Sequence, residues 1–131
     1  MLPIREVILI VARASLREAL AEFWRDAGCR THAFATARGG RRRLALAKGP
    51  ALVVVDTRAP GATALLTALR ASPALRRMPV VAIVPRARRV PGAFATVTRP
   101  RDLSAWLAIY ERLRRRNDGA AAELVAVRPA A

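Results

Sequence analysis

The stretch ALVVVDTRAPG, residues 51–61, decides the fold of this chain. A continuous run of apolar and β-branched residues ends at a carboxylate, Asp56, and a turn that contains Pro60 and Gly61 follows. Continuous apolar runs are typical of strands covered on both faces, as in parallel sheets flanked by helices. Ligands and chemistry collect just beyond the carboxyl ends of such strands. The stretch therefore predicts a central buried strand and, at Asp56, a candidate site.

Apolar runs and alternating segments predict further strands on either side of this one. The predicted strands, in chain order, cover residues 6–11, 31–35, 51–56, 79–84 and 94–98. Helical periodicity fills the intervals, and the predicted helices cover residues 15–29, 38–48, 62–77 and 102–116. Strands that alternate with helices require a mostly parallel sheet with helices on both faces. The fold class is therefore α/β.

Local signals set the predicted helix ends. Ser15 is expected to cap the first helix, and Gly28 to stop it. The helix at 38–48 can hold Gly39 and Gly40 only at its start, and Pro73 ends the main body of the helix at 62–77.

The connection between the last two predicted strands is too short for a helix. Only 14 residues separate Val84 from Arg99, and Pro85 and Pro91 lie among them. We therefore expect a turn or an irregular basic loop in place of a fourth crossover helix. Residues 1–116 are expected to form one domain, and the small residues of 117–131 to form a C-terminal tail that is a candidate for disorder.

The charge balance is strongly basic. The 131 residues contain 24 Lys and Arg against 9 Asp and Glu, which gives a net charge of +15. A net positive charge of this size produces a positive electrostatic potential, which favours binding of phosphates, nucleic acid or an acidic protein partner. The arginine clusters are candidate anion or nucleic-acid contacts, or alternatively an ordinary solvated surface: Arg41, Arg42, Arg43, Arg86, Arg88 and Arg89.

Several classes of function find no support in the sequence. The lone Cys29 excludes an internal disulfide and any cysteine-based zinc site, and we expect Cys29 and His32 to be structural. A single histidine leaves no recognisable catalytic triad or dyad, so no enzyme, cofactor or metal is predicted. The apolar run near the start is too short for a membrane span and lacks a cleavage pattern, which predicts a cytoplasmic protein.

Four segments in this order resemble the receiver domain of two-component response regulators. They are VILIV followed by LREAL, the stretch 51–61, LRASPALRRMPVVAIV and TRPRDLSAWL, within residues 6–116. The resemblance implies a flavodoxin-like (CheY-like), doubly wound, five-stranded fold and a role in bacterial phosphorelay signalling. It also implies that Asp56 occupies the position of the aspartate that accepts a phosphoryl group from a histidine kinase.

The metal-binding part of the family pattern is missing. Receivers hold Mg²⁺ with the acceptor aspartate and an acidic pair after the first strand, but Ala12 and Arg13 stand there in this chain. The resemblance therefore identifies a degenerate pseudo-receiver. We expect Asp56 to be ion-paired to Arg13 or Arg99; a working phosphoacceptor without the usual metal is the less favoured alternative.

The other family positions of this pocket are also changed. Val84 replaces a hydroxyl residue, Thr96 replaces an aromatic residue, and Arg99 replaces the phosphate-clasping lysine, followed by the retained Pro100. Arginine keeps the charge, but its planar fork is not equivalent to a compact ammonium.

The last helix carries an apolar stripe that is either core or a partner surface. We expect a candidate interface there, formed by Leu103, Trp106, Leu107 and Tyr110. The predicted function is a phosphorylation-independent, non-catalytic protein-interaction module. Its expected partner is a histidine kinase, a response regulator, an acidic surface or a second copy of the chain. The alternative is a basic nucleic-acid-associated protein on a receiver scaffold.

Overall fold

The computed structural model describes residues 4–47, 50–73 and 75–127. Its centre is a sheet of five parallel strands in the order β2-β1-β3-β4-β5. The strands are β1 Glu6–Ile10, β2 Arg30–Phe34, β3 Ala51–Asp56, β4 Val80–Ile83 and β5 Ala95–Val97. The predicted α/β class and the doubly wound, flavodoxin-like arrangement are confirmed.

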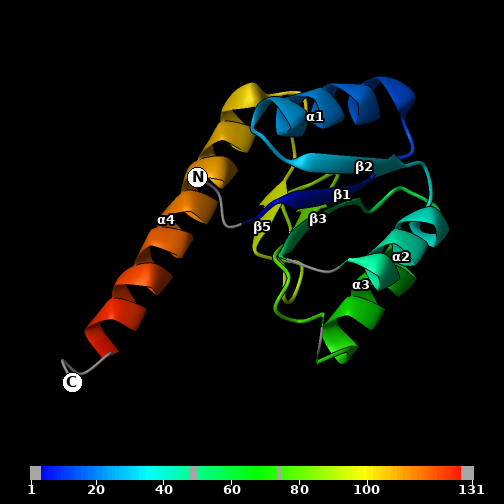
Figure 1. Ribbon diagram of the computed structural model, residues 1–131. Coiled ribbons are helices and arrows are strands. Elements are labelled where there is room, and N and C mark those ends of the chain that lie inside the picture. Colours follow the sequence, from blue (N-terminus) through cyan, green and yellow to red (C-terminus); the bar gives the residue numbers. More distant parts are fainter. Residues whose placement is uncertain (1–3, 48–49, 74, 128–131) are drawn as a thin grey trace.

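Helices cover both faces of the sheet. They are α1 Ala14–Asp26, α2 Ala37–Leu46, α3 Ala62–Ala71 and α4 Leu103–Val127. One core cluster joins α1 and α4 to the sheet, and a second joins α2 and α3 to its opposite face. Figure 1 shows α1 above the sheet and α2 and α3 below it.

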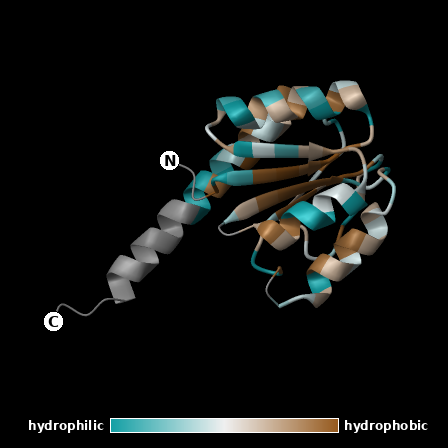
Figure 2. Ribbon diagram, turned by 45° about the vertical axis from the view of Figure 1, so that its right-hand side comes forward, coloured by the Kyte–Doolittle hydropathy of each residue, from teal (hydrophilic) through white to brown (hydrophobic). Residues whose placement is uncertain are grey.

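Burial on both faces explains why the central strands read as continuous apolar runs. Leu52 and Val54 of β3 face α1 and α4, whereas Val53 and Val55 face α2 and α3. All six residues of β3 are buried, and the sixth is Asp56. In Figure 2 the central strands are mostly brown, and the helices carry teal on their outer sides.

The connection from β4 to β5 contains no helix, as the sequence predicts. Residues 84–94 are all described, and they run as turns and irregular backbone between the two strands. Thr96 of β5, paired in register with Ala82, is exposed to solvent. The outward residue at this part of β5 is therefore polar.

Two helix ends differ from the sequence-based expectation. The first helix begins at Ala14, and its cap residue is Arg13, which makes no side-chain capping hydrogen bond. Ser15 lies inside the first turn, where its Oγ accepts a hydrogen bond from Arg101 at 2.8 Å. The last helix continues past Arg116 to Val127. Residues 118–127 contain one glycine and no proline, so no strong breaker ends the helix there.

Gly40 allows α2 to lie close to the sheet. The helix begins at Ala37, so Gly40 belongs to its first turn, as expected. A Cβ atom added to Gly40 would overlap the side chain of Ile10 on β1. The glycine is therefore required by close packing rather than by its conformational freedom.

No helix in the described part of the chain combines the length and the apolar character needed to cross a membrane.

Candidate functional site

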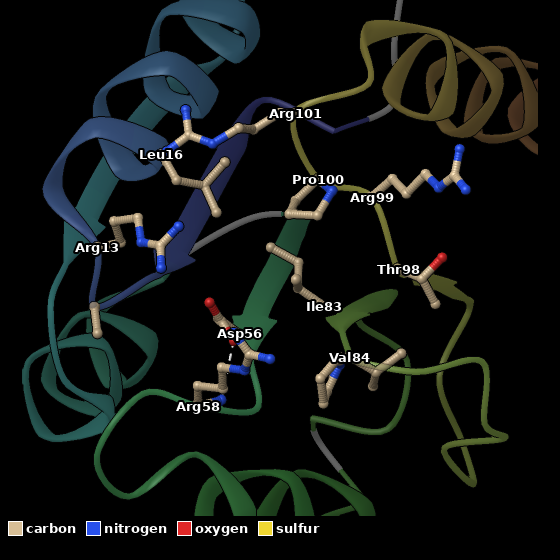
Figure 3. Close-up of a pocket in the computed structure, with 12 residues that line it drawn as sticks. Arg13, Leu16, Asp56, Arg58, Ile83, Val84, Thr98, Arg99, Pro100 and Arg101 are labelled. Atoms are coloured by element: carbon tan, nitrogen blue, oxygen red, sulfur yellow. Dashed lines mark hydrogen bonds between the residues drawn. The ribbon is translucent and has the colours of Figure 1, made fainter.

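A pocket of about 450 Å³ lies at the carboxyl-terminal edge of the sheet. Parallel strands end at one edge, so the loops after β1, β3, β4 and β5 converge there. Figure 3 shows Asp56 at the centre of this pocket. The lining residues are Ala12, Arg13, Leu16, Asp56, Arg58, Ile83, Val84, Pro85, Thr98, Arg99, Pro100 and Arg101.

Asp56 is held by the turn that follows it. Its Oδ1 accepts a hydrogen bond from the backbone N–H of Arg58 at 2.9 Å, and its carbonyl oxygen accepts one from the N–H of Ala59 at 2.9 Å. Thr57 fixes the same turn against β4, because its Oγ1 donates to the carbonyl of Ile83 at 3.0 Å. The carboxylate is largely buried, and its second oxygen, Oδ2, accepts no hydrogen bond from any described residue.

The predicted ion pair of Asp56 is not formed. Arg13 and Arg99 both line the pocket, yet neither forms a salt bridge with Asp56 among the described residues. In Figure 3 Arg13 points into the pocket, whereas Arg99 points away from Asp56. The prediction was wrong because the Arg58 N–H already satisfies one carboxylate oxygen, and the two arginines are exposed and solvated.

Arg99 acts electrostatically on a different carboxylate. Asp102 accepts hydrogen bonds from Ser104 Oγ at 2.7 Å and from Ser104 N at 3.0 Å, at the start of α4. These hydrogen bonds lower the pKa of Asp102, and the positive charge of Arg99 lowers it further. The charge of Arg99 is therefore felt at the start of α4.

Most of the predicted pocket residues meet in one place, and one does not. Ala12, Arg13, Val84, Arg99 and Pro100 all line the pocket with Asp56. Thr96 does not, because strand alternation exposes it while Val97 beside it is buried.

Arg58 and Arg101 also line the pocket, although neither was predicted to do so. The signal that could have found them is their position directly after the ends of β3 and β5, where parallel strands deliver their loops to one edge. With Arg13 and Arg99, they place four arginines around a single carboxylate.

These residues do not fit a magnesium ion. Mg²⁺ prefers several oxygen ligands, which carboxylates commonly supply. Asp56 is the only acidic residue that lines the pocket, and the described residues contain no cluster of three or more His, Cys, Asp or Glu side chains. The arginines would repel the ion from the positions where its ligands are needed.

The apolar stripe of α4 is divided between core and surface. Trp106 is 2% exposed and packs edge-to-face on Trp24, so including it in the candidate interface was wrong. Leu103 and Leu107 are 58% and 49% exposed. With Tyr110 and residues of α1 they line a second groove, of about 480 Å³.

The two arginine clusters differ in position, and one arginine of the first cluster is held by an ion pair. Arg43 is tied to Glu6, whose Oε1 accepts from Arg43 Nε at 2.9 Å. His32 Nε2 lies 2.9 Å from the same oxygen, without hydrogen-bond geometry. Arg41 and Arg42 are exposed on α2, which contacts β1 and β2, whereas residues 86–89 follow β4 on the other side of β3.

Receiver domains are among the solved structures that this chain resembles. The chemotaxis response regulator CheY4 of Vibrio cholerae superposes with a TM-score of 0.72 at 16% identity, covering 84% of this chain and 98% of that one. The signal receiver domain of a signal transduction histidine kinase from Syntrophus aciditrophicus gives a TM-score of 0.69 at 23% identity, covering 82% and 88%. The chain has the receiver fold.

The structural match covers nearly the whole length of some of these receiver domains. A response regulator from Thermotoga maritima, solved in complex with Mg²⁺-BeF, gives a TM-score of 0.71 at 13% identity and is covered over 99% of its length. Neither a protein-family model nor a curated relative matches the sequence. At these identities the likeness establishes the receiver fold, and the chemistry must be argued from the pocket itself.

Proposed function

We propose that this chain is a degenerate receiver domain of two-component or phosphorelay signalling. It is a non-catalytic module of the bacterial cytoplasm that binds a protein partner without phosphorylation of Asp56. The observation that carries the proposal is the composition of the pocket. Asp56 stands at the end of β3, but Ala12 and Arg13 occupy the loop after β1 and no second carboxylate lines the pocket.

The chemistry of phosphoryl transfer supports this reading. A carboxylate that attacks a phosphoryl group brings negative charge against negative charge, and cations must neutralise the charge that develops. Arg13 and Arg58 supply positive charge, but a guanidinium does not bridge the acceptor and phosphoryl oxygens as a metal ion does. Asp56 is therefore an inefficient acceptor.

Incubation with acetyl phosphate and Mg²⁺ is expected to leave the protein unmodified. Intact-mass spectrometry would measure the phosphoryl adduct, and Asp56→Asn provides the background. Less than about one molecule in ten is expected to carry an adduct, because the metal site that speeds the transfer is incomplete. A stoichiometric adduct that is absent from Asp56→Asn would refute the proposal in favour of a working phosphoacceptor.

The groove between α1 and α4 is the proposed partner surface. Leu103 and Leu107 supply exposed apolar area, Phe23 and Tyr110 line the same groove, and apolar patches of this kind mark interaction sites. A photo-crosslinking amino acid at position 107 is expected to capture one specific protein in cells. That capture should persist with Asp56→Asn and fall at least about tenfold with Leu103→Asp, because a charge opposes burial of the groove.

The matched control is Leu46→Asp, since Leu46 is 63% exposed on α2, outside the groove. Capture should be unchanged in that variant. If Asp56→Asn abolishes the capture, the partner depends on the aspartate and the proposed independence from phosphorylation is wrong.

A further inference from the structure

The Asp56 pocket combines arginine side chains with an apolar wall. Arg13, Arg58, Arg99 and Arg101 come from three different loops and surround one cavity. Among the residues whose side chains the structure describes, 4–47, 50–73 and 75–116, the side chains of Arg13, Arg58 and Arg99 form no hydrogen bond or salt bridge, and Arg101 donates only to Ser15. Three guanidinium groups are therefore free to bind an anion.

The charged residues that line the pocket are mostly positive. Four arginines and one carboxylate line it, and Arg13 points into it whereas Arg99 points away from Asp56 (Figure 3). The first turn of α1, beside Arg13, contains no acidic residue and no capping side chain, so its backbone N–H groups add to the positive potential. An anionic group is thus favoured at the rim of the pocket and disfavoured next to Asp56.

The apolar part of the pocket lining favours a ligand in which the anionic group is attached to a larger organic group. Ala12, Pro85 and Pro100 form apolar walls, above the buried side chains of Ile83 and Val84. The cavity, about 450 Å³, falls in the range of small-molecule sites and greatly exceeds the size of an inorganic phosphate. The unused Oδ2 of Asp56 requires a hydrogen-bond donor from whatever occupies the centre.

We propose that this pocket binds a nucleoside phosphate. Its phosphate is held by Arg13 and Arg58, its sugar or base lies against the proline walls, and a hydroxyl or amino group donates to Asp56 Oδ2. This binding is non-covalent and needs no metal ion. It goes beyond the proposed function, since neither the protein partner nor phosphorylation of Asp56 enters it.

Calorimetric titration with AMP and GMP, without Mg²⁺ and at about 150 mM salt, tests the proposal. Neither nucleotide is a phosphoryl donor, so binding is separated from acetyl phosphate chemistry. We expect saturable one-to-one binding of at least one of them. Arg13→Gln and Arg58→Gln should each weaken that binding at least about tenfold, because each removes a charge-assisted contact.

Arg41→Gln and Arg88→Gln are the matched controls, because both residues are exposed and neither lines the pocket. Each control removes the same charge and should change affinity by less than about twofold. Absence of saturable binding, or an equal loss in the controls, would overturn the proposal. Equal affinity for inorganic phosphate would also overturn it, because the organic body would then contribute nothing.

The variant Asp56→Asn distinguishes two roles of the Asp56 carboxylate: accepting a hydrogen bond from the nucleotide, or only repelling its negative charge. The Asn oxygen can keep the hydrogen bond from the Arg58 N–H, which turns the amide NH₂ toward the pocket in place of Oδ2. Nucleotide binding should then weaken, while pyrophosphate, which offers no donor, should bind more tightly. If the variant binds the nucleotide more tightly as well, the assigned role of Asp56 is wrong and the proposal fails.

Discussion

Trp106→Ala is expected to lower the free energy of unfolding by about 3–5 kcal/mol, the usual cost of removing a buried tryptophan. Trp106 is 2% exposed and lies edge-to-face against Trp24, with ring centroids 6.4 Å apart. The substitution leaves a cavity between α1, α4 and the sheet that these rigid elements cannot fill. Chemical denaturation and thermal melting would measure the loss, and the melting temperature should fall by roughly 10–20 °C.

Trp106 also anchors the loop that carries two of the pocket arginines. Its Nε1 donates to the carbonyl oxygen of Pro100 at 2.7 Å, between Arg99 and Arg101. Trp106→Phe keeps most of the packing and loses this hydrogen bond, which should cost about 1–2 kcal/mol. Trp106→Phe therefore tests the hydrogen bond to Pro100 without leaving a large cavity in the core.

Leu107→Ala is the matched control for Trp106→Ala, since Leu107 is the next residue of α4 and is 49% exposed. Its stability should change by less than about 1 kcal/mol. If the two variants lose equal stability, the division of the α4 stripe into core and surface is incorrect.

Cys29 is expected to react with a thiol reagent at least about a hundredfold more slowly in the native protein than in denaturant. The reacting species is the thiolate, and burial raises the pKa of the Cys29 thiol above its ordinary value. The side chain is also closed off within the core cluster, with Sγ 3.7 Å from the carbonyl oxygen of Ile4. Reaction then waits for a local opening of the structure.

The same pKa shift gives the sign of a pH effect. Because the folded-state pKa is raised, stability from the neutral thiol is fully present below the unfolded-state pKa and is lost as pH rises through the folded-state pKa. Cys29→Ser lacks this titration, so its melting temperature should decline less on the alkaline side. Rapid modification of the native thiol at neutral pH would contradict the assigned burial.

Prediction from the sequence was strongest where the signal is local. The continuous apolar runs of β1 and β3 identified strands with helices on both faces, because a strand covered on one face shows alternation instead. Pro85 and Pro91, in a connection of only 14 residues, excluded a crossover helix. The position of Ala12 and Arg13 was equally predictable, since the loop after the first strand carries both residues to the pocket that contains Asp56.

Prediction was weaker for side chains whose interaction partners lie far away in the sequence. Arg13 or Arg99 was expected to pair with Asp56, but neither does, and the charge of Arg99 acts on Asp102 at the start of α4. Ser15 was expected to cap α1, but it accepts a hydrogen bond from Arg101, which is 86 residues away in the chain. These pairings depend on how the loops are arranged in the folded protein, so they cannot be predicted from neighbouring residues in the sequence.

The sequence by itself determined the order of strands and helices along the chain and the absence of a helix between β4 and β5. These features follow from residue type and spacing, which act over a few neighbouring positions. Only the tertiary structure decided that Trp106 is core while Leu107 is surface, and that Arg58 joins Arg13 around one cavity. The rotation of α4 against the sheet and the common edge of parallel strands fix both outcomes, and each is a property of packing between segments far apart in the chain.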